Sequence, residues 1–149
     1  MGSATYAWML RNVSTVQEQT GTGWPYQQPT WVFTSRTLPA VPGHDIRFVS
    51  GPVQPVHEAM RAAAGDRNIW VVAGGNLAGQ FFDAGLLDEL IVQVGSVTLG
   101  HGKPLFPRRV LHPALRLAEV RAMGEGFAEL RYVVSRAIRS EPRNDARRC

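Results

Sequence analysis

Two kinds of apolar periodicity alternate along this chain. Short runs rich in β-branched and aromatic residues predict strands over Thr30–Ser35, Ile46–Val49 and Ile69–Ala73. The last of these runs is apolar on both alternating faces, which is typical of a buried parallel strand. Apolar residues that recur every three or four positions predict helices over Tyr6–Val13, Pro55–Ala63 and Leu77–Ala84.

The C-terminal half alternates apolar and polar residues. A strand is predicted over Glu89–Leu99, and two more, Leu115–Arg121 and Phe127–Arg136, flank the glycine turn Met123–Gly126. Strands joined by a short glycine turn form an antiparallel hairpin. Residues 17–29 are polar with glycine and proline and predict a loop. The order of elements indicates the α/β class: three layers around a mostly parallel sheet, closed by an antiparallel C-terminal hairpin.

The junction between the predicted strand Ile69–Ala73 and the helix after it carries two glycines, Gly74 and Gly75. A helix that begins at such a turn directs unpaired N–H groups and the positive end of its dipole at an anion. A phosphate held by Gly74, Gly75, Asn76, Leu77 and Ala78 is one interpretation. Glycines that serve only the geometry of the turn are the other.

Three segments together resemble a known family. The strand IWVVAGG, the stretch FFDAGLLDEL and the segment VTLGHGKPLF are similar, in order and spacing, to the reductase domain of the dihydrofolate reductase superfamily. The branch they resemble most is the C-terminal domain of the bifunctional riboflavin-biosynthesis deaminase-reductase (RibD C-terminal-like). The resemblance covers almost all of residues 1–138 and implies a dihydrofolate reductase-like fold.

The resemblance also implies a cofactor site. The N-terminal MGSATY resembles a Met-Gly-Arg-x-Thr motif with Ser3 in place of arginine, which would bring Gly2, Ser3 and Thr5 near the cofactor phosphates. After the strand Thr30–Ser35, Ser35 and Arg36 match a pair that contacts the adenosine end in the family. An arginine there suits a 2′-phosphate and implies NADPH. The alternative is a surface arginine at a strand end.

In the family, a strand, a substrate-contacting loop and a helix come before the MGSATY position. The resemblance therefore implies that the fold lacks its first strand in this chain. Met1 is a wrongly chosen start, a product of truncation or the start of a genuinely shortened protein, and the sequence leaves these three open. The catalytic residues are unknown because their usual positions lie in the part before Met1. An α/β core without a central strand has unpaired backbone and exposed apolar surface, so we expect association, as a homodimer, or poor solubility.

Composition limits the remaining classes. The formal net charge is +4, and four arginines lie in residues 139–149, a segment without aromatic residues or apolar periodicity. We interpret it as a disordered basic tail and expect no nucleic-acid partner, although an arginine-tail nucleic-acid binder is an alternative. No apolar run is long enough for a bilayer and no signal peptide is recognisable, so we expect no membrane partner and a cytoplasmic location. The single cysteine, Cys149, predicts no thiolate metal site.

The function implied by the resemblance is an NADPH-dependent reductase that transfers a hydride to a pterin, pyrimidine or related small substrate. One alternative is 5-amino-6-(5-phosphoribosylamino)uracil reductase of riboflavin biosynthesis; the zinc motifs of the partner deaminase domain are absent from this sequence. Another is a truncated, non-catalytic nucleotide-binding module, which would bind the cofactor without turnover.

Overall fold

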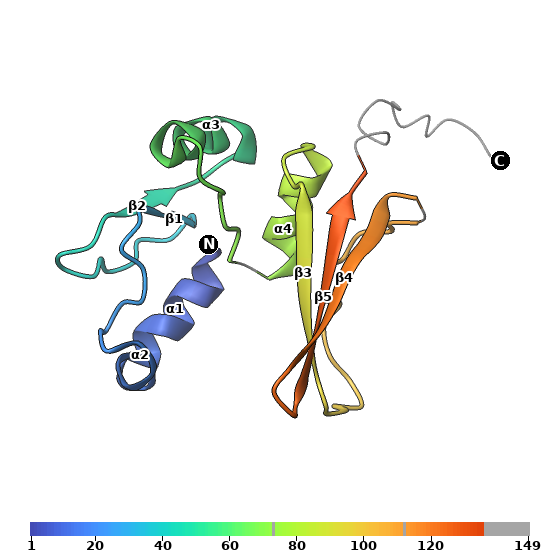
Figure 1. Cartoon of the computed structure of the whole chain (residues 1–149). Coiled ribbons are helices and arrows are strands. Elements are labelled where there is room, and N and C mark those ends of the chain that lie inside the picture. The colour runs from blue at the N-terminus through green and yellow to red at the C-terminus, as the bar shows by residue number, and fades with distance from the viewer. Residues whose placement is uncertain (73, 112, 136–149) are drawn as a thin grey trace. The chain divides into compact units, whose positions relative to one another are not determined.

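The computed structural model describes residues 1–72, 74–111 and 113–135 (Figure 1). The predicted tail, residues 139–149, lies outside this part. The described elements, in chain order, are α1 (Ser3–Arg11), α2 (Val13–Thr20), β1 (Thr30–Phe33), β2 (Ile46–Val49), α3 (Val53–Ala64), α4 (Gly75–Asp83), β3 (Glu89–Gly95), β4 (Leu115–Met123) and β5 (Phe127–Val134).

These elements fall into two compact units. The N-terminal unit comprises Met1–Ala84 and Pro104–Pro107, and the C-terminal unit comprises Gly85–Lys103 and the chain from Arg108 onward. The first holds the helices and a parallel pair of strands, and the second holds a three-stranded antiparallel sheet. The mixture of parallel and antiparallel pairing confirms the predicted α/β class.

In the N-terminal unit, β1 and β2 pair in parallel from Thr30 opposite Ile46 to Phe33 opposite Val49. The other edge of β1 carries a single parallel bridge, from Phe33 to Gly2. The backbone N–H of Phe33 donates to the carbonyl of Met1 at 2.9 Å. This bridge places the start of α1 directly beside the end of β1.

The core of this unit forms where α1 meets β1. Its buried side chains are Met1, Tyr6, Met9, Trp24 and Val32. Tyr6 and Met9 lie three positions apart in α1 and so share one face of the helix. The Tyr6 hydroxyl donates to the Pro39 carbonyl at 2.6 Å, and burial raises the pKa of Tyr6. The loop aromatic Trp24 packs edge-on against Tyr6, with ring centroids 5.5 Å apart.

Two local predictions are wrong. Residues 17–20 belong to α2 rather than to a loop, since glutamine and glutamate tolerate a helix until Gly21 ends it in the left-handed conformation. Residues 69–72 are not assigned as a strand, and Trp70 is 74% exposed rather than buried. A strand requires a hydrogen-bonded neighbour, and within the described ranges no ladder joins residues 69–72 to another segment.

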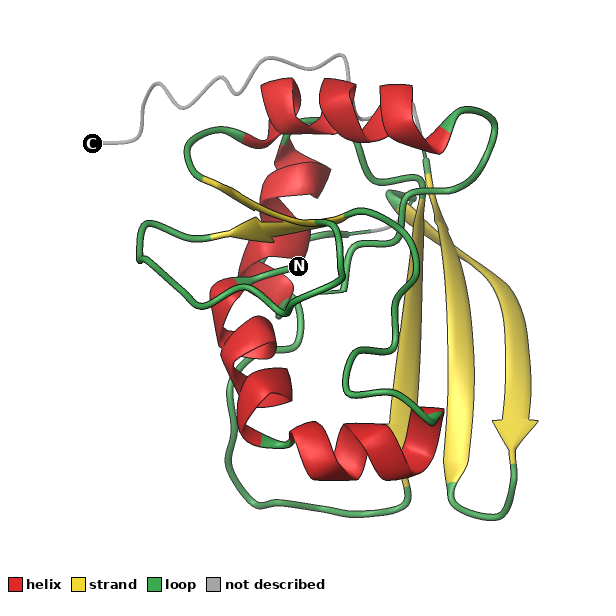
Figure 2. Ribbon diagram, turned by 90° about the vertical axis from the view of Figure 1, so that its left-hand side faces the viewer, coloured by secondary structure: helices red, strands yellow, loops and turns green. Residues whose placement is uncertain are grey.

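The strands of the C-terminal unit lie side by side in one sheet (Figure 2). Their order is β3-β5-β4, with β5 in the centre, as labelled in Figure 1. One face carries ion pairs, together with the exposed apolar side chains of Ile91 and Phe127. On it the Arg131 side chain binds the Glu89 carboxylate at 2.5 Å, and Arg121 binds Glu129. That arginine holds the pKa of Glu129 below its usual range. The opposite face is apolar and carries Leu90, Val92, Val94, Leu117, Val120, Leu130 and Tyr132. The predicted hairpin is confirmed, with Gly124 of its turn at φ 61°.

None of the helices in the described ranges is long and apolar enough to cross a membrane. The longest of them, α3, has twelve residues.

The buried amino group of Met1 makes the stability of the fold depend on pH. In a chain with a free amino group at Met1, burial lowers its pKa from 8.0 to about 6. Because the folded pKa lies below the unfolded one, folding is disfavoured while the group is charged. The free energy of unfolding should rise by on the order of 2 kcal/mol as the pH rises from about 6 to about 8.

Urea denaturation across this pH range would measure the effect. The control is the Nα-acetylated chain, which has no amine to titrate and should lack this rise. Equal pH profiles for the two chains would contradict the prediction.

Candidate functional site

Two helices of the N-terminal unit begin at glycines. Gly2 is the N-cap of α1 and Gly74 is the N-cap of α4, and both have extended backbone. Neither cap makes a side-chain hydrogen bond, and neither helix has an acidic residue in its first turn. Both helix ends therefore offer backbone donors and a positive dipole end with no carboxylate beside them.

The first group of predicted residues gathers at the start of α1. The Arg36 guanidinium donates from Nη2 to the Ser3 hydroxyl at 3.1 Å, although 33 positions separate the two residues. The backbone N–H of Arg36 donates to Thr34 Oγ1 at 2.9 Å, which fixes the turn after β1. The pairing of Gly2 with Phe33 completes the arrangement. The structure thus brings Gly2, Ser3 and Arg36 together as one cluster.

Thr5 and Ser35 lie close to this cluster in sequence. Thr5 is in the first turn of α1, and Ser35 lies between Thr34 and Arg36. Ser35 is exposed and Thr5 is partly buried. Within the described ranges neither hydroxyl makes a hydrogen bond, so both side chains are free to contact a bound group.

The second group, Gly74 to Ala78, forms the start of α4. Leu77 and Ala78 are buried, and their N–H groups donate to the Gly74 carbonyl at 3.2 and 3.5 Å. This leaves the N–H groups of Gly75 and Asn76 as the open donors of the turn. The two groups are connected by packing: the rings of Phe33 and Phe81 lie 5.9 Å apart, edge to face.

The paired glycines have different surroundings. A Cβ on Gly75 would lie 1.9 Å from the carbonyl oxygen of Leu105, so this glycine allows the segment Pro104–Pro107 to lie against the helix. A Cβ on Gly74 would meet nothing within 4 Å. The turn-geometry interpretation therefore accounts for Gly75. The open space at Gly74 is compatible with a phosphate that approaches the backbone.

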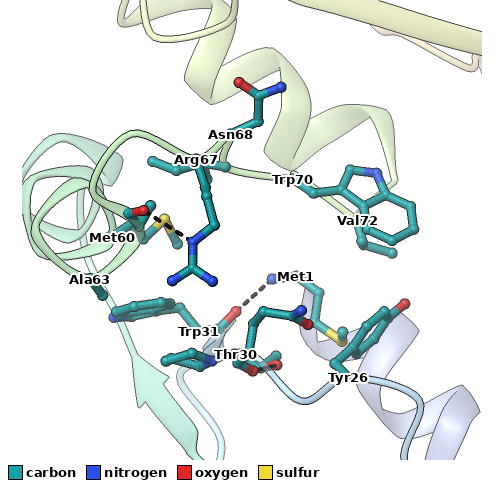
Figure 3. Close-up of a pocket in the computed structure, with 14 residues that line it drawn as sticks. Met1, Tyr26, Thr30, Trp31, Met60, Ala63, Arg67, Asn68, Trp70 and Val72 are labelled. Carbon is teal, nitrogen blue, oxygen red and sulfur yellow. Dashed lines mark hydrogen bonds between the residues drawn. The ribbon is translucent and has the colours of Figure 1, made fainter.

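A separate pocket of about 440 Å³ lies in the same unit (Figure 3). Its walls are largely apolar, with Trp31, Met60, Trp70 and Val72 among them, and Arg67 contributes a guanidinium. Sequence reasoning missed this pocket because it assigned residues 69–72 to a buried strand. Trp70 could have indicated the pocket, because a large aromatic residue within the apolar residues 69–72 can line a cavity as well as pack in a core.

Titratable chemistry in the pocket is limited. Burial raises the pKa of Tyr26 and lowers that of the Met1 amino group. No Asp, Glu or His is among its lining residues. Within residues 1–72, 74–111 and 113–135, no group of three His, Cys, Asp or Glu side chains could hold a metal ion.

Comparison with known proteins identifies the fold and the family. The sequence matches the RibD C-terminal domain family over residues 10–128. It is 31% identical to YwjB, an uncharacterized protein of Bacillus subtilis strain 168, over 110 residues, and 32% identical to YyaP of the same organism, also uncharacterized, over 66 residues. The matches cover 73% and 44% of this chain but only 62% and 35% of those proteins, so the chain spans less than two thirds of either relative.

Two solved structures share the fold. One is a protein from Shewanella sp. PV-4 that is named for riboflavin biosynthesis, with a TM-score of 0.60 at 19% identity, over 88% of this chain and 79% of that one. The other is RibD of Acinetobacter baumannii, with a TM-score of 0.51 at 18% identity, over 70% of this chain and 31% of that one. These likenesses confirm the predicted dihydrofolate reductase-like fold.

The contrast between the glycines gives a matched pair of variants. Gly75→Ala should lower the free energy of unfolding by about 1–3 kcal/mol or more, because the new methyl group collides with the Leu105 backbone. Gly74→Ala should change stability by well under 1 kcal/mol, since its backbone has φ −65° and its surroundings are open. Guanidinium denaturation of both variants measures the difference, and equal losses would show that the segment Pro104–Pro107 does not lie against Gly75.

Proposed function

Because this chain belongs to the RibD C-terminal domain family, a family of reductases, we propose that it binds NADPH and reduces a small pterin, pyrimidine or related substrate. The observation that carries the proposal is the hydrogen bond between Arg36 and Ser3. It holds a guanidinium beside the uncapped start of α1, where a phosphate would meet both.

The charge pattern of the cluster favours a dianionic ligand. A guanidinium has five N–H donors in a planar fork, and the bond to Ser3 uses one of them. The remaining donors suit the oxygens of a 2′-phosphate, which NADPH has and NADH lacks. Neither first turn has a carboxylate that would repel such a group.

The residues fit distinct parts of the cofactor. Arg36, Ser3 and Ser35 would hold the 2′-phosphate end, while the N–H groups of Gly75 and Asn76 would bind the pyrophosphate, with Gly74 leaving room for it. When bound, the nicotinamide would supply the hydride, and the chain would supply position and electrostatics. The described residues do not identify a proton donor.

The substrate is proposed within the same class. Both structural neighbours have names tied to riboflavin biosynthesis, which favours a pyrimidine related to 5-amino-6-(5-phosphoribosylamino)uracil. The competing candidate is a nucleotide-binding module without turnover. NADPH oxidation in the presence of that pyrimidine separates the two, since the module would bind the cofactor and consume none.

Arg36 gives the test of cofactor choice. Arg36→Ala should weaken NADPH binding by about 10-fold to 100-fold, the loss expected for a charge-assisted hydrogen bond, and leave NADH binding unchanged. Nicotinamide fluorescence during titration measures both dissociation constants. Arg11→Ala removes the same charge from the opposite end of α1 and should affect neither cofactor.

A wild-type chain that is folded by circular dichroism and binds neither cofactor would overturn the proposal. Equal losses for Arg36→Ala and Arg11→Ala would show that general charge, rather than the Arg36 cluster, attracts the ligand.

We also propose that the chain forms a homodimer through the apolar face of the C-terminal sheet. On the outer strand β4, Leu117 is 50% exposed and Val120 is 59% exposed, and both lie on that face. The opposite face of the same strand is charged and suits water. Apolar side chains that recur along one face of an outer strand are typical of a surface that another chain covers.

Two glutamine variants on β4 test the dimer. Val120→Gln places an amide on the apolar face and should raise the dimer dissociation constant by on the order of 100-fold, because a two-fold interface contains the change twice. Arg116→Gln lies on the charged face and should leave association unchanged. Sedimentation velocity measures both, and a wild-type chain that stays monomeric at high concentration would contradict the proposal.

A further inference from the structure

The turn after β1 holds the backbone of Arg36 with a single hydroxyl group. Thr34 Oγ1 accepts a hydrogen bond from the Arg36 backbone N–H at 2.9 Å, and the same hydroxyl donates to the Arg36 carbonyl at 3.3 Å. A threonine hydroxyl that bonds to the backbone two residues further on stabilises a compact turn. Thr34 thus engages both backbone polar groups of Arg36 and leaves the guanidinium to make contacts elsewhere.

This turn is attached to the rest of the N-terminal unit on both sides. At its start, the Thr34 backbone N–H donates to the Val49 carbonyl of β2 at 2.8 Å. Further along, the Pro39 carbonyl accepts from the hydroxyl of Tyr6, a side chain of α1 that is 0% exposed. Both attachments end on regular elements, so the position of the Arg36 backbone relative to α1 is fixed.

The guanidinium of Arg36 gains a defined direction from this arrangement. Arg36 is exposed, and an exposed arginine that binds a phosphate must give up the entropy of its many rotamers. The bond from Arg36 Nη2 to the Ser3 hydroxyl, at 3.1 Å, selects one direction before any ligand binds. Since Ser3 belongs to α1, this bond requires the Arg36 backbone to stay where Thr34 holds it.

We propose that Thr34 is a positioning residue that sets the preference for NADPH over NADH. It holds Arg36 so that the guanidinium lies beside Ser3 before the cofactor arrives, and the 2′-phosphate then meets a donor that is already in place. The inference rests on the proposed function, because the 2′-phosphate is the group that distinguishes the two cofactors. A hydroxyl that served only the shape of the turn would affect both cofactors alike.

Variants of Thr34 test this role. Thr34→Val removes the hydroxyl and keeps the branched shape. It should raise the NADPH dissociation constant by about 3-fold to 10-fold, the loss expected for one hydrogen bond, and change the NADH constant by less than about twofold. Thr34→Ser keeps a hydroxyl and should restore NADPH binding. Thr37→Val makes the same change at an exposed position nearby and is the matched control. Nicotinamide fluorescence of the full chain measures all four constants.

A double-mutant cycle tests whether Thr34 acts through Arg36. In a chain that already carries Arg36→Ala, the guanidinium to be positioned is absent. Thr34→Val should therefore cause no further loss of NADPH binding in that chain, although it weakens binding in the wild type.

The positioning itself is measured without any cofactor. Nitrogen-15 relaxation of the Arg36 Nε–H group in the free chain reports how far its side chain is ordered. Thr34→Val should lower the order parameter into the range of a flexible group, below about 0.6, while Thr37→Val should leave it at the wild-type value.

Each measurement can overturn the proposal. Equal losses of NADPH and NADH in Thr34→Val would show that the hydroxyl supports the turn alone. The same NADPH loss with and without Arg36 would show that Thr34 does not act through the guanidinium. An unchanged order parameter in Thr34→Val would overturn the positioning role even if the cofactor binds. A folded wild-type chain that binds neither cofactor would instead overturn the reductase proposal, and with it the cofactor preference.

Discussion

The pairing of Gly2 with Phe33 is the contact on which the N-terminal unit depends. It is one parallel bridge at the free edge of β1, yet it determines where α1 begins and therefore where Tyr6 and Met9 enter the core. The same bridge carries Ser3 to Arg36 across 33 positions of sequence. The packing of the core and the cluster proposed to bind phosphate thus depend on one backbone contact.

A second constraint operates at the start of α4. Gly75 admits the Leu105 backbone at a distance that no side chain would allow, and Gly74 faces open space. Phe82 and Phe106 pack edge to face beside this contact, with centroids 5.6 Å apart. Two adjacent glycines therefore have separate tasks, one in packing and one in keeping the helix end accessible.

The sequence predicted those elements whose pattern is local. Alternation of apolar and polar residues predicts the bounds of β2, Ile46–Val49. A glycine turn predicts the hairpin of β4 and β5, and Gly65 predicts the end of α3. The prediction of a strand over residues 69–72 was wrong because the sequence shows that these residues are apolar, but it does not show whether a neighbouring strand pairs with them. The family resemblance placed Ser3 and Arg36 separately at the cofactor, and their hydrogen bond was not predicted, since spacing alone does not relate residues 33 positions apart. The pocket was missed because residues 69–72, which line part of it, were assigned to a buried strand.

The position of Met1 has a practical consequence for anyone who handles this protein. Its amino group points into the pocket rather than into solvent, with Trp31 as its acceptor. The first residues of any polypeptide joined before Met1, such as a purification tag, would lie inside the pocket. A chain with residues before Met1, whether a purification tag or further residues of the protein itself, therefore has part of this pocket filled.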